Sequence, residues 1–148
     1  MPAKRLLAAL LILSPATSLP RSHDTPWLTV VGDAGNPDAD TILIDPRPVA
    51  MKGHQRWMNL RLNRARHRTS TDGVGFRSFT AEVEFDCQKM SARFTRTQFY
   101  GGPLWTAPGS LMVYPPTMVR PMVFRDFEPN PREKVIHAAC SLRPAGVQ

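Results

Sequence analysis

Residues 79–87 read FTAEVEFDC and carry the clearest pattern in the chain. Phe, Ala, Val, Phe and Cys alternate there with Thr, Glu, Glu and Asp. Successive side chains of a β-strand point to opposite faces, so this alternation predicts a strand with one buried face and one solvated face. Cys87 should therefore share the buried face with the two aromatic rings.

A second strand with the same alternation is predicted over residues 55–63. Met58, Leu60 and Leu62 lie there between polar residues, which again gives one buried face and one wet face. A polar loop is expected to follow, over residues 64–75. Strands of this kind are typical of an antiparallel sheet that has one side in water.

Weaker β-rich runs predict further strands over residues 27–31, 41–45 and 91–100. The last of these should form a hairpin with residues 79–87. Three prolines, Pro115, Pro116 and Pro121, interrupt residues 111–127. Because proline cannot donate to a strand ladder, any strand in that segment should be short or at a sheet edge.

The last part of the chain predicts a helix. Asn130 is a good N-cap, Pro131 suits the first turn, and Glu133 occupies the capping-box position. The following residues form one apolar stripe, made of Val135, Ile136, Ala139, Cys140 and Leu142. A strand cysteine and a helix cysteine that both face the core predict an α+β fold, with the helix across an antiparallel sheet.

The first 18 residues predict a secretory signal peptide. Lys4 and Arg5 give a positive start, an unbroken apolar run of eight residues follows, and residues 16–18 are the small residues Ala, Thr and Ser. The apolar run is too short for a membrane anchor, which needs roughly 20 residues. We expect residues 1–18 to be removed, residues 19–148 to form one domain, and the mature chain to have no transmembrane anchor.

The two cysteines, Cys87 and Cys140, predict one disulfide. A cysteine pair in a small exported domain meets an oxidising compartment, where disulfides form and persist. The spacing fits neither a Cys-x-x-Cys redox motif nor a structural zinc site. Closing a loop of about 54 residues should stabilise the fold by about 4 kcal/mol in the chain-entropy model.

The chain is basic, with 19 Lys and Arg residues, 12 Asp and Glu residues and a net charge of +7. Loss of Lys4 and Arg5 with the signal peptide leaves 17 basic residues against 12 acidic ones, a net charge of +5 that favours anionic partners. The densest basic cluster supplies the candidate binding residues Arg56, Trp57, Arg61, Arg64, Arg66 and Arg68. Arginine clusters hold phosphate or sulfate groups. The alternative is a solvated basic face without a ligand.

The sequence contains no convincing catalytic or metal-binding motif. The four histidines, His23, His54, His67 and His137, have neither the spacing of a helical zinc site nor a Glu between two of them. No serine lies in a Gly-x-Ser-x-Gly elbow. We therefore expect a protein that is not an enzyme and has no metal or cofactor; a pair of histidines acting across the sheet is the enzymatic alternative. Nucleic acid is not expected as a partner, because no nucleic-acid-binding signature is found.

Residues spread over the whole mature chain match the pattern of one known family. They are Trp27, Asp45, Gly53, Ser78, Phe85, Asp86, Cys87, Arg93, Tyr100, Phe127, Pro129 and Cys140. In this order they resemble the surface-adhesin protein E family of small exported bacterial proteins. The resemblance implies a bent antiparallel β-sheet of about five to six strands, with a C-terminal helix tethered by a disulfide.

The chain departs from the family pattern at three points. Phe127 stands where a Trp is usual, Asn130–Pro131 replaces the usual Gly–Ser at the helix start, and no cysteine that could take a lipid follows the signal. The resemblance implies an exported, non-enzymatic binding module that can form a homodimer through its sheet. The partner it implies is a host extracellular glycoprotein.

Together with the basic cluster, the resemblance predicts contact with an acidic host glycoprotein or an anionic glycan. The protein would then act in the periplasm, at the cell surface or as a secreted protein. The alternative function is that of a periplasmic structural or assembly factor of the envelope.

Overall fold

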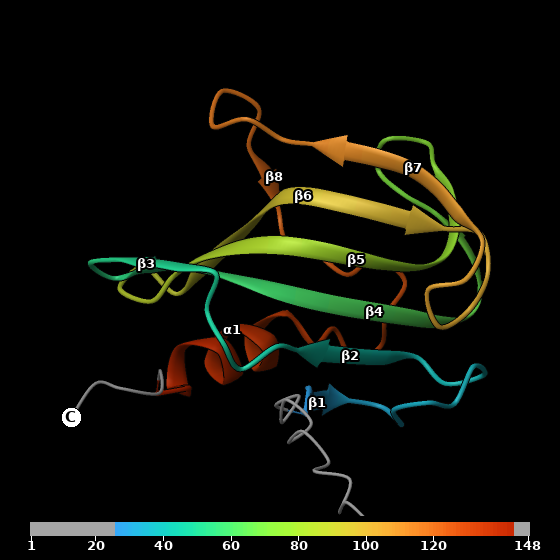
Figure 1. Ribbon diagram of the computed structural model, residues 1–148, viewed down its shortest axis with the longest axis horizontal. Helices are drawn as coiled ribbons and strands as arrows, with labels where there is room; N and C mark the ends of the chain where they lie inside the picture. Colours follow the sequence, from blue (N-terminus) through green and yellow to red (C-terminus); the bar gives the residue numbers. More distant parts are fainter. Residues whose placement is uncertain (1–25, 144–148) are drawn as a thin grey trace, which may run out of the picture.

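The computed structural model describes residues 26–143, so the expected signal peptide at residues 1–18 lies outside the described part. The chain forms one antiparallel sheet, which is twisted and bent, with a helix near its C-terminal end (Figure 1). The elements are β1 (Leu28–Val31), β2 (Thr41–Ile44), β3 (Ala50–Lys52), β4 (Gln55–Thr69), β5 (Gly75–Asp86), β6 (Ser91–Tyr100), β7 (Pro108–Val113), β8 (Arg120–Pro121) and α1 (Arg132–Ser141). The strand order is β1-β2-β4-β5-β6-β7, while β3 pairs with β4 and β8 pairs with β6. The predicted α+β fold class is confirmed.

One face of the sheet forms the hydrophobic core, and we call it the core face. The buried apolar side chains of the two longest strands are Met58, Leu60, Leu62, Phe76, Phe79, Ala81, Val83 and Phe85. All of them except Phe76 lie in the predicted alternation. The helix and the segment before it add Tyr114, Met122, Phe124, Phe127, Val135, Ile136 and Ala139 to the same core. The opposite face, which we call the outer face, carries the polar residues of the alternation.

Strand β4 is longer than the sequence predicted. It ends at Thr69 and β5 begins at Gly75, so the polar loop expected over residues 64–75 is wrong for residues 64–69. The pairing with β5 is irregular after Asn63, and both Asn63 and Arg64 are buried. Because polar side chains fill the buried positions at this irregularity, apolar alternation could not reveal that the strand continues.

Helix α1 begins one residue later than predicted. Pro131 occupies the N-cap position and no side chain caps the helix, so the predicted capping box with Glu133 does not form. Asn130 instead accepts a hydrogen bond from the backbone amide of Arg132 through Oδ1 (3.1 Å) and donates through Nδ2 to the carbonyl oxygen of Phe124 (2.9 Å). Asn130 therefore connects the helix start to the segment that precedes it.

The other end of α1 is attached to the sheet at two points. Cys87, directly after β5, forms the predicted disulfide with Cys140, and their Cα atoms are 5.6 Å apart. Arg56 of β4 donates through Nη1 to the carbonyl oxygens of Ala139 (2.9 Å) and Leu142 (2.8 Å). Carbonyl groups in the last turn of a helix have no partner within the helix, so Arg56 supplies the donors they need.

Candidate binding site

The six candidate binding residues all lie on β4, but in different environments. Arg56 is bonded to the end of α1, Arg64 is buried, Arg66 is exposed, and Arg68 is half-buried. Trp57 and Arg61 belong to the outer face, with Trp57 opposite Glu84 and Arg61 opposite Thr80 in the pairing with β5. The structure therefore separates a cluster that is continuous in the sequence into residues that support the fold and residues that reach the surface.

Arg64 lies inside the protein, with only 3% of its side chain exposed. It donates through Nε to Asp40 (3.0 Å), through Nη1 to the carbonyl oxygen of Arg125 (2.9 Å) and through Nη2 to that of Asp126 (2.6 Å). Burial alone would raise the pKa of Asp40, but hydrogen bonds from a backbone amide and from Arg64 hold that pKa below its usual value. Arg64 therefore holds the segment before α1 against the sheet and does not face solvent.

Arg61 contacts two tryptophan rings on the outer face. Its guanidinium carbon is 4.1 Å from the centre of the Trp27 ring and 4.7 Å from that of Trp105. These two cation–π contacts restrict the orientation of the guanidinium group. Within residues 26–143 no acceptor is bonded to Arg61, and its Nε is buried without a partner. Packing thus positions this side chain while its hydrogen-bonding capacity stays unused.

Trp105 is presented by the loop between β6 and β7, which reaches across the ends of β5 and β4 (Figure 1). The amide of Leu104 donates to Oδ1 of Asn63 (2.8 Å), and the amide of Trp105 donates to Oγ of Ser78 (2.9 Å). Leu104, Trp105 and Ala107 all have positive φ angles, which residues other than glycine rarely adopt. Strained backbone of this kind clusters at functional sites. The conformation of this loop is therefore a reason to consider this surface a binding site.

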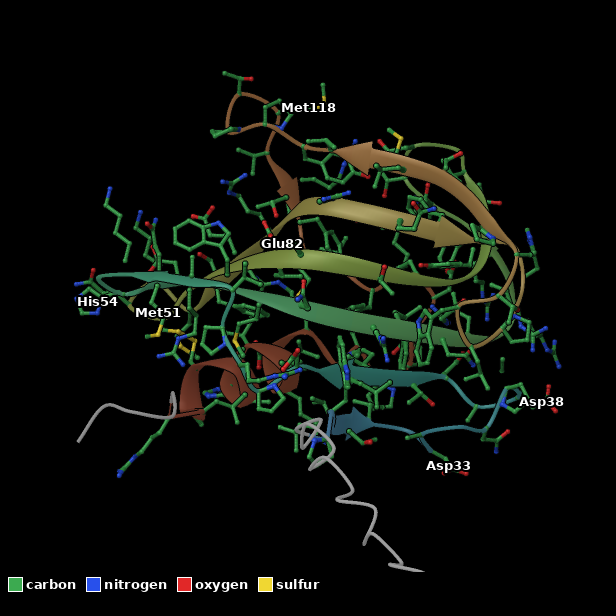
Figure 2. The ribbon with its side chains drawn as sticks, in the orientation of Figure 1. Asp33, Asp38, Met51, His54, Glu82 and Met118 are labelled. Carbon is green, nitrogen blue, oxygen red and sulfur yellow. A yellow bond between two sulfur atoms is a disulfide. The ribbon has the colours of Figure 1, made fainter. Side chains whose placement is uncertain are left out.

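A groove of about 480 Å³, which we call the outer groove, surrounds Arg61 on the outer face. Its side chains come from β4, β5, β6 and the residue before β1, and they include Trp27, Asn59, Arg61, Thr80, Glu82, Arg96, Gln98 and Tyr100. Glu82, labelled in Figure 2, projects from the middle of the sheet and accepts a hydrogen bond from the hydroxyl of Thr95 (2.8 Å). Two arginines against one glutamate make the groove net positive.

Sequence reasoning named Arg61 but missed most of its neighbours in this groove. The sequence indicates Trp27 and Tyr100 only as members of predicted strands and of the family pattern. It gives no signal for Trp105, which contacts Arg61 but is not among the residues that line the groove. Trp57, another of the candidate binding residues, does not line the groove. Trp27 and Trp105 are distant from Arg61 in sequence. The pairing of β1 with β2 and of β2 with β4 brings Trp27 to Arg61, and the folding of the β6–β7 loop brings Trp105 there.

The histidines of the described segment are exposed and lie on separate parts of the fold. His54 is in the turn between β3 and β4, where Figure 2 labels it, His67 is near the end of β4, and His137 is on α1. None of the three lines the outer groove. Over residues 26–143, no group of three or more His, Cys, Asp and Glu side chains is arranged to hold a metal ion.

Comparison with known proteins gives one family. A family model described as surface-adhesin protein E matches residues 27–141, which span every strand and the helix. No curated protein and no solved structure matches the chain. The helix in the described part of the chain is neither long nor apolar enough to cross a membrane. On the family match, the chain belongs to the surface-adhesin protein E family.

Proposed function

We propose that the chain is an exported, non-enzymatic adhesin-like binding protein whose outer groove binds an acidic glycan or an acidic segment of a glycoprotein. The observation that carries this proposal is Arg61, which contacts the rings of Trp27 and Trp105 while no acceptor among residues 26–143 is hydrogen-bonded to it. Membership of an adhesin family supports a binding function.

Arg61 has the chemistry to contact a carboxylate or a sulfate group. The planar guanidinium binds two oxygens of such a group at once, which gives both affinity and geometric selectivity. Because the rings of Trp27 and Trp105 contact the guanidinium by cation–π interactions, an anion would bind at the edge that carries the N–H groups. Little side-chain freedom would be lost on binding, since the side chain is already positioned.

The remaining groove residues suit a hydrophilic ligand such as a sugar chain. Asn59, Thr80 and Tyr100 offer amide and hydroxyl groups. The amide nitrogen of Gln98 donates to the carbonyl oxygen of Gly109 (2.9 Å), which orients the amide oxygen as an acceptor for a sugar hydroxyl. Enclosed apolar pockets favour apolar small molecules, whereas this open polar groove favours a glycan.

The other basic residues of β4 have different roles in this proposal. Arg66 is exposed and adds to the positive field that attracts an anionic partner. Arg56 and Arg64 act through the fold, because their donors are bonded to α1 and to the segment before it. Trp57 lies farther along the outer face, where it can contact a longer ligand.

We also propose that residues 1–18 are removed on export and that the protein acts at the cell surface. The Cys87–Cys140 disulfide supports an oxidising compartment, because such bonds are rare in the cytoplasm. Protease treatment of intact cells should degrade the protein. Complete protection would instead place it in the periplasm, as the alternative of an envelope assembly factor requires.

Binding of the purified mature protein to immobilised heparin and to a sialylated glycoprotein tests the groove. Arg61→Met should weaken binding about 10- to 100-fold, which corresponds to one charge-assisted hydrogen-bond contact of about 1.5–3 kcal/mol. The matched variant Arg66→Met removes an exposed charge five positions away on the same strand and should lower affinity only slightly. Equal affinity of the Arg61→Met and Arg66→Met proteins would contradict the assignment, as would unchanged binding to the desulfated and desialylated ligands.

A further inference from the structure

Glu82 lies in the middle of the outer groove, with an arginine on the strand to either side. The register places Glu82 of β5 opposite Asn59 of β4 and opposite Arg96 of β6. Arg61 is two residues from Asn59 on β4, so it is a diagonal neighbour of Glu82 on the same face. All three charged side chains line the groove. Positive, negative and positive charges therefore follow one another across the sheet.

The two arginines keep donors that are open to a ligand. Of the Arg61 nitrogens only Nε is buried without a partner, so Nη1 and Nη2, which have no acceptor within residues 26–143, are accessible to solvent. Arg96 is exposed, and no acceptor in the same range is bonded to it. Asp45, which follows β2, uses both carboxylate oxygens for Arg47 (3.0 Å each). Both groove arginines can therefore donate to an anion without breaking an existing hydrogen bond.

Glu82 has unused bonding capacity of the opposite kind. Its Oε1 accepts a hydrogen bond from the hydroxyl of Thr95 (2.8 Å), which holds the carboxylate in place. Within the described part of the chain, Glu82 has no ion pair, and its Oε2 has no donor. An ionised carboxylate only accepts hydrogen bonds, and it repels a second anion nearby. Glu82 therefore favours a ligand hydroxyl beside it and disfavours a carboxylate or a sulfate at that place.

The spacing of the two arginines determines how the acidic groups of a ligand must be separated. Neighbouring strands lie about 4.8 Å apart and two residues along a strand cover about 7 Å, so the Cα atoms of Arg61 and Arg96 are about 12 Å apart. Two adjacent acidic groups would leave one of them beside Glu82. An acidic group, a neutral stretch with hydroxyls and a second acidic group match the order of charges in the groove.

We propose that the outer groove selects a glycan in which carboxylated sugars alternate with neutral sugars, an inference that rests on the anion binding proposed above. One carboxylate accepts hydrogen bonds from Nη1 and Nη2 of Arg61, and the next carboxylate binds Arg96. The neutral sugar between them donates a hydroxyl hydrogen bond to Glu82. A densely sulfated glycan also pairs with the arginines, but it brings further anions next to Glu82. Glu82 thus determines the specificity of the groove.

Calorimetric titration of the mature protein with two tetrasaccharides, at one ionic strength, tests this specificity. A hyaluronan tetrasaccharide has alternating uronate and neutral sugars, and a heparin tetrasaccharide is densely sulfated. The hyaluronan fragment should bind about 10-fold more tightly, because it gains a hydrogen bond to the charged Glu82. Glu82→Gln keeps an oxygen for Thr95 but removes the charge, so it should raise heparin affinity and remove most of the preference. The control Glu133→Gln removes the same charge from an exposed position on α1 and should leave the preference unchanged.

Arg96→Met separates the second carboxylate contact from the first. A hyaluronan disaccharide carries one carboxylate and the tetrasaccharide carries two, so the wild-type protein should bind the tetrasaccharide about 10-fold more tightly. Arg96→Met should lose this gain while its affinity for the disaccharide stays nearly unchanged. Arg96 is exposed, so this variant should fold. Arg66→Met, another exposed arginine, should retain the gain.

The outcomes distinguish this inference from the proposed function. Suppose that Arg61→Met weakens glycan binding, but Glu82→Gln leaves the preference unchanged or Arg96→Met retains the tetrasaccharide gain. The groove then binds anions without the selection proposed, and the inference alone is overturned. If Arg61→Met binds both glycans as tightly as the wild-type protein, the proposed function fails and this inference fails with it.

Discussion

Replacement of Arg64 by methionine should destabilise the fold, although the sequence placed Arg64 among the candidate binding residues. The variant loses a buried charge that bonds to Asp40 and to the carbonyl oxygens of Arg125 and Asp126. Removing one partner of a buried ion pair costs about 3–5 kcal/mol. Because one third of the Asp40 side chain is exposed, water recovers part of its solvation, and we expect the lower end, about 3 kcal/mol. That change lowers the folding equilibrium constant more than 100-fold.

Urea unfolding followed by tryptophan fluorescence measures this loss. The control is Arg66→Met, which changes an exposed residue on the same strand and should alter the free energy of unfolding by no more than about 0.5 kcal/mol. A double-mutant cycle with Asp40→Asn then isolates the part that depends on the ion pair. If Arg64→Met and Arg66→Met unfold at the same urea concentration, the structural role assigned to Arg64 is refuted.

Three further predictions concern stability and titration. Cys140→Ser should lower the free energy of unfolding by about 4 kcal/mol, because the disulfide closes a loop with a sequence separation of 53. A reducing agent should lower the thermal unfolding midpoint of the wild-type protein to that of the Cys140→Ser variant. Absorbance titration at alkaline pH should show Tyr114 ionising near pH 12, and Tyr114→Phe should remove that phase. Since the folded-state pKa of Tyr114 is raised, stability should fall as pH rises from about 10 to 12, and less so in Tyr114→Phe. Folding lowers the pKa of Asp40, so the stabilising effect of its charged form should be lost as pH falls below about 4. In the Asp40→Asn variant, the free energy of unfolding should depend less on pH in that range.

The fold could be predicted well wherever the buried side chains are apolar. The alternation in residues 79–87 gave β5, and Met58, Leu60 and Leu62 gave the first part of β4, because a half-buried strand has a period of two. The prediction failed beyond residue 63, where Asn63 and Arg64 are buried and satisfied by hydrogen bonds. A polar residue in the core looks like a loop residue in the sequence, since only its partners reveal its burial.

The candidate site could be predicted only in part. Arg61 was identifiable because basic residues cluster around it, but the same cluster included Arg56 and Arg64, which support the fold. Charge along a strand does not tell which side chains have partners. Trp105 could not be found from sequence, because its position depends on a strained loop bonded to Asn63 and Ser78. Long-range contacts of this kind leave no local pattern.

The double attachment at the end of α1 also determines how the protein would carry tension. A pull on the chain beyond Arg143 would reach the sheet through Cys140 and Cys87 before it could peel the helix from the core. The load would enter at the end of β5, a strand paired on both sides, by β4 and by β6. Shearing a central strand requires many hydrogen bonds to break together, whereas a helix can unwind turn by turn. A molecule anchored from that side would therefore transmit traction directly to the strands that line the outer groove.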